Sequence, residues 1–154
     1  MSALAHLFPG SNMSPYQIVL VKQSFERLRP ISMVAAEIFY DKLFEIDPSL
    51  RSMFKGDMKR QGSMLMSMID AAVRGLDNPH ALIPMLKSMG ARHSHYGVQD
   101  VHYATVGNAF LHTLEIGLGE DFIPDVRDAW LKVYGLIAST MLEGAREVPM
   151  QNAA

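Results

Sequence analysis

The sequence predicts an all-α domain of about seven or eight helices, and three observations predict it. Apolar residues recur at spacings of three and four in successive segments, as on one face of a helix. Several of these segments open on a capping residue followed by proline. No segment alternates apolar and polar residues with period two, as a half-buried strand would.

The length predicts a single domain, because 154 residues lie within the usual range of about 100–200 residues. Hydrophobic residues make up 49% of the chain and charged residues 19%, which argues against disorder. We expect residues 14–147 to form the folded domain. Residues 1–13 are expected to be a loose N-terminal arm, and residues 148–154 a C-terminal tail.

The first helix is expected to start at a capping box. Ser14 precedes Pro15, and Gln17 stands three residues after the serine, which is a typical helix start. One apolar face then follows from Ile18, Val21, Phe25 and Leu28. Pro30 ends this helix, because proline cannot continue the hydrogen-bond ladder.

Three helices are expected in the next part of the chain. The first runs from about Ser32 to Glu45, and a short one opens at Asp47-Pro48 and ends at Phe54. A polar bend leads into a third helix from about Lys59 to Arg74.

The remaining helices are separated by turn residues. Asp77-Asn78-Pro79 forms a turn whose Asp and Asn can cap the helix over residues 79–95. Asp100 is expected to cap the helix over residues 100–118. The last helix is expected over residues 123–146.

Composition excludes several classes of function. The chain has no cysteine, which excludes disulfides, thiolate nucleophiles, iron–sulfur clusters and cysteine-based zinc sites. A net charge of -2 without a basic tract predicts no nucleic-acid partner. No apolar run reaches about 18 residues and no secretory signal is visible, so we expect no membrane partner and a cytoplasmic location. Paired Glu-x-x-His motifs, His-Glu-x-x-His and a glycine-rich phosphate loop are also missing.

Three strings remain that together are specific. They are Phe39-Tyr40-Asp41-Lys42-Leu43-Phe44, then Arg92-His93 with Tyr96-Gly97-Val98, and the run from Ala129-Trp130 to Gly135. In this order they resemble the bacterial globins, especially single-domain haemoglobins and the globin domain of flavohaemoglobins. The resemblance covers about Tyr16 to Arg146. It implies a globin fold around a haem pocket, with haem b (iron protoporphyrin IX) as cofactor and O2, and also NO and CO, as ligands.

The resemblance implies that His93 is the axial iron ligand on the proximal side. The alternative is a partly buried helix histidine packed by its neighbours. His95 points about 200° away around the helix, so it cannot share the face of His93. Phe54 matches the phenylalanine that globins hold against the haem plane, and its alternative is an ordinary core residue.

Tyr40 and Gln61 match the distal pair of the family, and Leu65, one turn later, would cover the pocket. The Tyr40 hydroxyl and the Gln61 amide can both donate to the partly negative outer atom of bound dioxygen, for about 1.5–3 kcal/mol each. The bend before Gln61 has no fixed length in this family. Met64 therefore competes with Gln61 for the distal position.

Tyr103 matches a proximal tyrosine that in flavohaemoglobins works with a glutamate behind the axial histidine; a core tyrosine is the alternative. A carboxylate there makes the imidazole more basic. This chain has Ala145 at the matching place, while Glu143 and Glu147 lie on other faces of the helix. Strong electron push of the peroxidase or dioxygenase kind is therefore not expected.

These residues lead to three functional hypotheses. The first is reversible O2 binding for supply, buffering or sensing. The second is a nitric oxide dioxygenase, which needs a separate reductase because the chain has no room for flavin and nicotinamide domains. The third is a haem-free signalling module, against which His93 and Phe54 both argue. A monomer or a homodimer is compatible with each.

Overall fold

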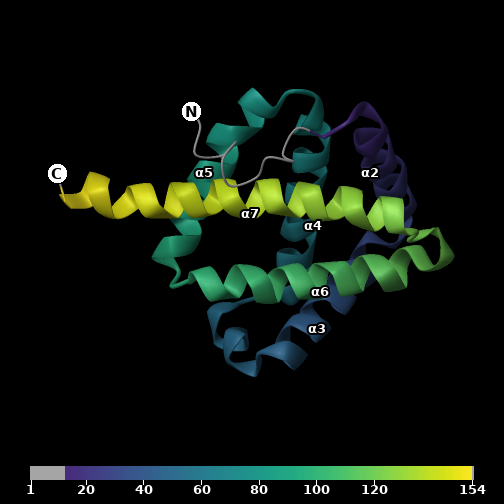
Figure 1. Ribbon diagram of the computed structural model, residues 1–154. Helices are drawn as coiled ribbons and strands as arrows, with labels where there is room; N and C mark the ends of the chain where they lie inside the picture. The colour runs from purple at the N-terminus through teal and green to yellow at the C-terminus, as the bar shows by residue number, and fades with distance from the viewer. Residues whose placement is uncertain (1–12, 154) are drawn as a thin grey trace.

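The structure is a computed structural model that describes residues 13–153, and within that range it is helical with no strand (Figure 1). The predicted all-α class is confirmed, with six α-helices, slightly fewer than expected, supplemented by four short 3₁₀ helices. The α-helices are α2 (Pro15–Leu28), α3 (Ser32–Ile46), α4 (Met58–Arg74), α5 (Pro79–His95), α6 (Asp100–Leu118) and α7 (Pro124–Ala153). The 3₁₀ helices are η2 (Arg29–Ile31), η3 (Pro48–Met53), η4 (Gly75–Asp77) and η5 (Gly119–Asp121). The expected N-terminal arm lies, apart from Met13, outside the described residues.

The predicted capping residues start two of the helical segments. Ser14 Oγ accepts from the Gln17 amide at 3.1 Å, while Gln17 Oε1 accepts from the Ser14 amide at 3.1 Å. Asp47 accepts from the Ser49 amide at the start of η3. At α4 the cap is Asp57, so the helix starts at Met58, one residue before the expected position.

One expected cap is wrong. Gln99, not Asp100, is the N-cap of α6, because the Gln99 amide donates to Nδ1 of His102 at 2.9 Å and completes a capping box. Asn78 is the N-cap of α5, as expected, although its side chain makes no capping hydrogen bond. At the other end of the chain, α7 continues to Ala153 rather than ending near Arg146.

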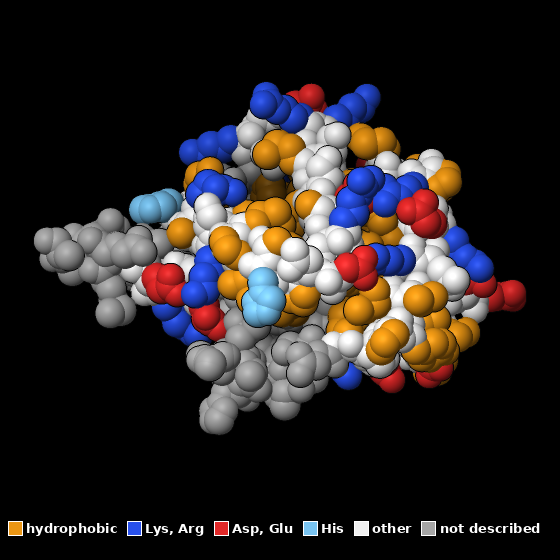
Figure 2. Space-filling model, turned by 90° about the horizontal axis from the view of Figure 1, so that it is seen from above, with side chains coloured by type: hydrophobic (Ala, Val, Ile, Leu, Met, Phe, Trp, Pro, Cys, Tyr) orange, Lys and Arg blue, Asp and Glu red, His pale blue; other side chains and the backbone are white. Residues whose placement is uncertain are grey.

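Charged side chains of both signs are scattered over the face shown in Figure 2, with hydrophobic side chains between them. Within residues 13–153 no helix has the length and apolar character needed to cross a membrane.

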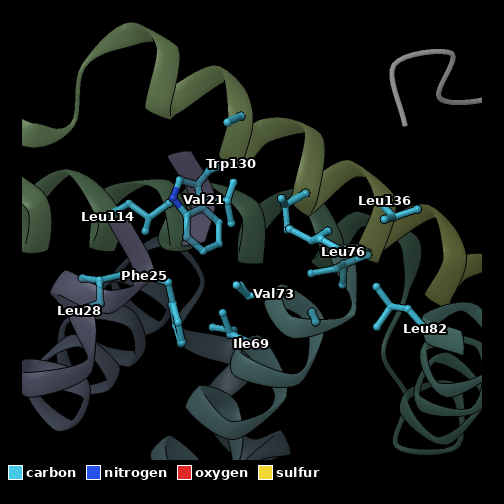
Figure 3. Close-up of a cluster of buried hydrophobic side chains, with 14 of the residues drawn as sticks. Val21, Phe25, Leu28, Ile69, Val73, Leu76, Leu82, Leu114, Trp130 and Leu136 are labelled. Atoms are coloured by element: carbon cyan, nitrogen blue, oxygen red, sulfur yellow. The ribbon is translucent and has the colours of Figure 1, made fainter. Parts of the chain in front are cut away.

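Trp130 lies at the centre of the larger hydrophobic core and is fully buried (Figure 3). Its indole N–H donates to Ser24 Oγ at 2.8 Å, which links α7 to α2 through a satisfied buried polar pair. The rings of Phe25 and Phe110 pack against it with centroid separations of 6.3 and 5.5 Å. This core joins helices α2, α4, α5, α6 and α7.

Helices α5 and α7 form the most extensive helix pair and touch backbone to backbone. A Cβ atom added to Gly90 would lie 1.8 Å from the carbonyl oxygen of Met141, and one added to Gly144 would lie 2.0 Å from that of Lys87. Only glycine permits such an approach. The two contacts are reciprocal, and they fix the position of α5, the helix that carries His93.

Candidate functional site

An aromatic cluster surrounds Tyr40 on α3. The Tyr40 ring lies 5.0 Å from Phe39, 6.0 Å from Phe44 and 5.3 Å from Phe54, measured between centroids. Phe54 reaches it because it caps the C-terminal end of η3 and has an extended backbone there. Tyr40 is only 8% exposed, so its hydroxyl lies in an apolar environment.

The N-terminal part of α4 contacts this cluster. The hydroxyl of Tyr40 donates to the backbone carbonyl of Gln61 across 3.4 Å. Burial raises the pKa of Tyr40 to about 12, so the phenol keeps its proton at neutral pH. Leu65 packs against both hydrophobic clusters, whereas the side chain of Met64 is 58% exposed. The Gln61 side chain is half-buried at the edge of the site.

On α5, the imidazole of His93 is held by its own helix. Its Nδ1 lies 2.7 Å from the carbonyl oxygen of Met89. A carbonyl only accepts, so Nδ1 carries the proton and Nε2 keeps its lone pair in the neutral ring. Burial lowers the pKa of His93, and the neighbouring Arg92 lowers it further, while the Met89 bond acts in the opposite direction. His95, two residues later, is exposed.

One face of α6 extends between the aromatic cluster around Tyr40 and the part of the core that contains Met89. Tyr103, Val106 and Phe110 follow one another at spacings of three and four, and all are half-buried. Val106 packs in the aromatic cluster, Tyr103 packs against the larger core together with Met89, and Phe110 belongs to both. The structure therefore brings Tyr40, Phe54, Leu65 and the Gln61 backbone together, and places Tyr103 and His93 outside that cluster.

Two residues, one beside Tyr103 and one on α5, were not predicted from the sequence as part of the site. The hydroxyl of Tyr134 donates to the carbonyl of Tyr103 and ties α7 to α6. Lys87 on α5 forms ion pairs with Glu143 at 3.7 Å and Glu147 at 3.0 Å on α7. These contacts join residues more than thirty positions apart, and no local pattern signals them.

The glutamates of α7 therefore face Lys87. Among the described residues, no hydrogen bond or ion pair links Glu143 or Glu147 to Tyr103 or His93. One carboxylate oxygen of Glu143 is buried and has no hydrogen-bond partner within residues 13–153.

The site chemistry fits a haem. In the described part of the chain, no three His, Asp or Glu side chains lie close enough to share a metal ion. A porphyrin supplies four nitrogens itself and requires one imidazole from the protein, and Nε2 of His93, which keeps its lone pair, could supply it. Half-buried apolar side chains on η3, α4, α5 and α6 offer the surface that a flat apolar ligand would cover; they include Phe54, Met58, Leu65, Met89 and Val106.

A helical fold with a half-buried histidine of fixed tautomer on α5 and an aromatic cluster around Tyr40 is typical of helical haem-binding proteins. The family model "Globin" matches residues 37–141, which is more than half of the chain. The chain belongs to the globin family. As a globin it takes haem as its cofactor and binds a gas ligand.

Two curated relatives indicate the range of the family to which the chain is similar. Neuroglobin of Danio rerio is 31% identical over 139 residues, which is 81% of this chain and 87% of the relative. The flavohemoprotein of Bacillus subtilis is 30% identical over 128 residues, which is 81% of this chain but only 32% of the relative. The similarity to the flavohemoprotein thus concerns about a third of that protein.

Solved structures show the same architecture. An engineered carbene transferase, from a protein of Rhodothermus marinus assigned as a nitric oxide dioxygenase, superposes with a TM-score of 0.82 at 29% identity. The match covers 93% of this chain and 100% of the other. A hexacoordinated haem protein from a tardigrade gives a TM-score of 0.81 at 16% identity over 90% of this chain and 98% of the other, which supports the fold alone.

Proposed function

We propose that this globin holds haem b through Nε2 of His93 and binds O2 reversibly on the opposite side, in oxygen supply, buffering or sensing. The haem supplies a ferrous iron with a free coordination position for a diatomic gas. The Met89 carbonyl fixes the tautomer and orientation of the His93 ring, as a partner of a metal-bound histidine does. The lowered pKa keeps the imidazole neutral, which coordination requires.

The buried hydroxyl of Tyr40 is the observation that carries the proposal. Within the described residues its one hydrogen bond is the 3.4 Å contact to the Gln61 carbonyl, which is at the limit of hydrogen-bond length. The hydroxyl can exchange this weak bond for one to a polar gas ligand. Three phenylalanine rings pack around the Tyr40 ring, and such apolar surroundings strengthen a hydrogen bond.

Gln61 is proposed as the second donor, with Leu65 covering the pocket. The exposed side chain of Met64 and the packing of Leu65 in both clusters support this assignment over Met64. Phe54 is proposed to contact the haem plane from its place beside Tyr40.

On the proximal side, the arrangement supports binding over redox catalysis. Tyr103 has no carboxylate partner from α7, since Glu143 and Glu147 bind Lys87 and Ala145 cannot supply one. The His93 imidazole therefore gains no additional basicity from a buried carboxylate. Tyr103 is proposed to shape the proximal wall.

A second candidate function is nitric oxide dioxygenation, in which O2 and NO combine to nitrate. The similarity to a flavohemoprotein and to a protein assigned as a nitric oxide dioxygenase favours it. This activity requires electrons from a separate reductase.

Absorption spectra of the ferric, ferrous and CO forms test the haem assignment. Wild type should show a Soret band, and His93→Ala should lose tight haem retention unless imidazole is added. A histidine-type CO spectrum in His93→Ala would refute His93 as the ligand.

Rapid mixing of the oxygenated protein with NO separates the two functions. Reversible O2 binding without sustained nitrate formation supports the first. Sustained turnover with a reductase supports the second.

A further inference from the structure

Several cations that form no ion pair within residues 13–153 lie near the aromatic cluster, where Arg51 stands over the Phe44 ring at 5.3 Å. Of the fourteen Lys and Arg residues, seven form an ion pair within residues 13–153. Four of the seven that do not lie within residues 51–60, and all four are exposed: Arg51, Lys55, Lys59 and Arg60. We name these four residues the basic rim.

The rim residues are neighbours in the chain of residues proposed for the gas site. Phe54 stands between Arg51 and Lys55, and its ring packs against Tyr40. Gln61 follows Arg60 in the chain. The rim thus borders the edge of the site at the turn from η3 into α4.

The local charge opposes that of the rest of the chain. Residues 51–60 contain four cations and one carboxylate, a net charge of +3, while the whole chain carries -2. That carboxylate, Asp57, accepts from the Lys59 amide as the cap of α4. Lys59 and Arg60 lie in the first turn of α4, where a cation is disfavoured by the helix dipole by about 0.3–1 kcal/mol each. Helix stability therefore does not explain their positions.

We propose that the basic rim is the docking surface for the acidic face of an electron-donating flavin protein. This inference rests on the second candidate function, nitric oxide dioxygenation, which leaves the iron ferric and requires electrons from a separate reductase. One electron leaves the reduced flavin and the ferric iron gains it, so no other reactant is needed. A complementary charged surface at the edge of the site steers the donor to the place where the electron path is short.

Nucleic acid is a poorer fit for the rim. Four cations confined to one corner of a chain with net negative charge do not form the extended basic stripe of a nucleic-acid-binding domain. An acidic protein surface can match a small patch of this kind.

The experiment titrates ¹⁵N-labelled haem-loaded protein with an acidic flavodoxin and follows amide shifts at about 20 and 200 mM salt. The expected shifts lie in residues 51–61, and the affinity falls at least tenfold between the two salt concentrations. Lys59→Glu should weaken binding at least threefold at low salt, and Lys55→Glu with Lys59→Glu at least tenfold.

Arg127→Glu is the matched control. Arg127 is also exposed and outside the ion pairs of the described residues, and it lies in the first turns of α7. Both glutamates are favourable near a helix N-terminus, so neither variant endangers folding. Because the two variants change net charge equally, less than twofold weakening is expected for Arg127→Glu.

Three outcomes would overturn the proposal: equal weakening by Lys59→Glu and Arg127→Glu, shifts confined to another surface, or a DNA duplex that binds more tightly than flavodoxin. Lack of a Soret band would instead refute the proposed function. The two failures are therefore distinguishable.

Discussion

Gly90→Ala tests how the α5–α7 crossing positions the proposed iron ligand. The new methyl group would lie 1.8 Å from the Met141 carbonyl oxygen, whereas a carbon–oxygen contact requires about 3.3 Å. Backbone atoms cannot rotate aside, so α5 must move away from α7 by roughly 1.5 Å. His93 lies three residues further along the same helix and moves with it.

Such a shift exceeds the roughly 0.5 Å within which a functional site must be held. We expect the rate of haem loss to rise about tenfold or more, measured as transfer of haem to an excess of an apoglobin. The free energy of unfolding should fall by about 1–3 kcal/mol through overpacking, less about 1 kcal/mol gained from replacing a helical glycine.

Gly117→Ala is the control, because it makes the same change inside α6 but meets side-chain ends and no backbone, with Leu28 Cδ2 at 2.7 Å and Ile31 Cδ1 at 3.7 Å. Gly144→Ala should reproduce the effect of Gly90→Ala, since its methyl group would lie 2.0 Å from the Lys87 carbonyl oxygen. If haem loss from Gly90→Ala matched that from Gly117→Ala, the crossing would not position His93 and the reasoning would be wrong.

Three further predictions follow from the site and the core. Tyr40→Phe should speed O2 release by about ten- to a hundredfold, because a hydrogen bond of about 1.5–3 kcal/mol is lost, and should change CO release much less. Equal effects on both gases in stopped-flow measurements would show that Tyr40 only packs and does not donate to the ligand. The gas-free ferrous protein should be five-coordinate with one broad visible band, because Met64 is exposed and the Gln61 amide is a poor ligand; split low-spin bands that Met64→Leu abolishes would show the opposite. Arg29 and Arg74 lower the pKa of Asp70 below its usual 3.8, so the carboxylate stabilises the fold above about pH 4 and loses this contribution as the pH falls. Asp70→Asn should therefore cost about 0.5–1 kcal/mol at pH 7 and nothing near pH 2 in urea titrations, and a constant difference across that range would contradict the assignment.

The helical class and most helix boundaries could be predicted from local signals in the sequence. The Ser14–Gln17 capping box, the Asp47-Pro48 start and the span of α5 depend on hydrogen bonds and spacings within one or two turns, which a single segment contains. Local signals failed where two neighbouring residues could both cap. Gln99 rather than Asp100 is the N-cap of α6, because His102 completes the capping box with Gln99.

The resemblance to globins predicted candidate site residues, but how they contact one another depends on the packing of the whole fold. The packing of Tyr40 on Phe54, the bond from Tyr134 to the Tyr103 carbonyl and the pairing of Lys87 with Glu143 join separate segments. Helical periodicity states which face of a helix is buried and not which neighbour covers it. The neighbour is selected by the shape of the whole core, in which close approaches such as that at Gly90 set the distances between helices.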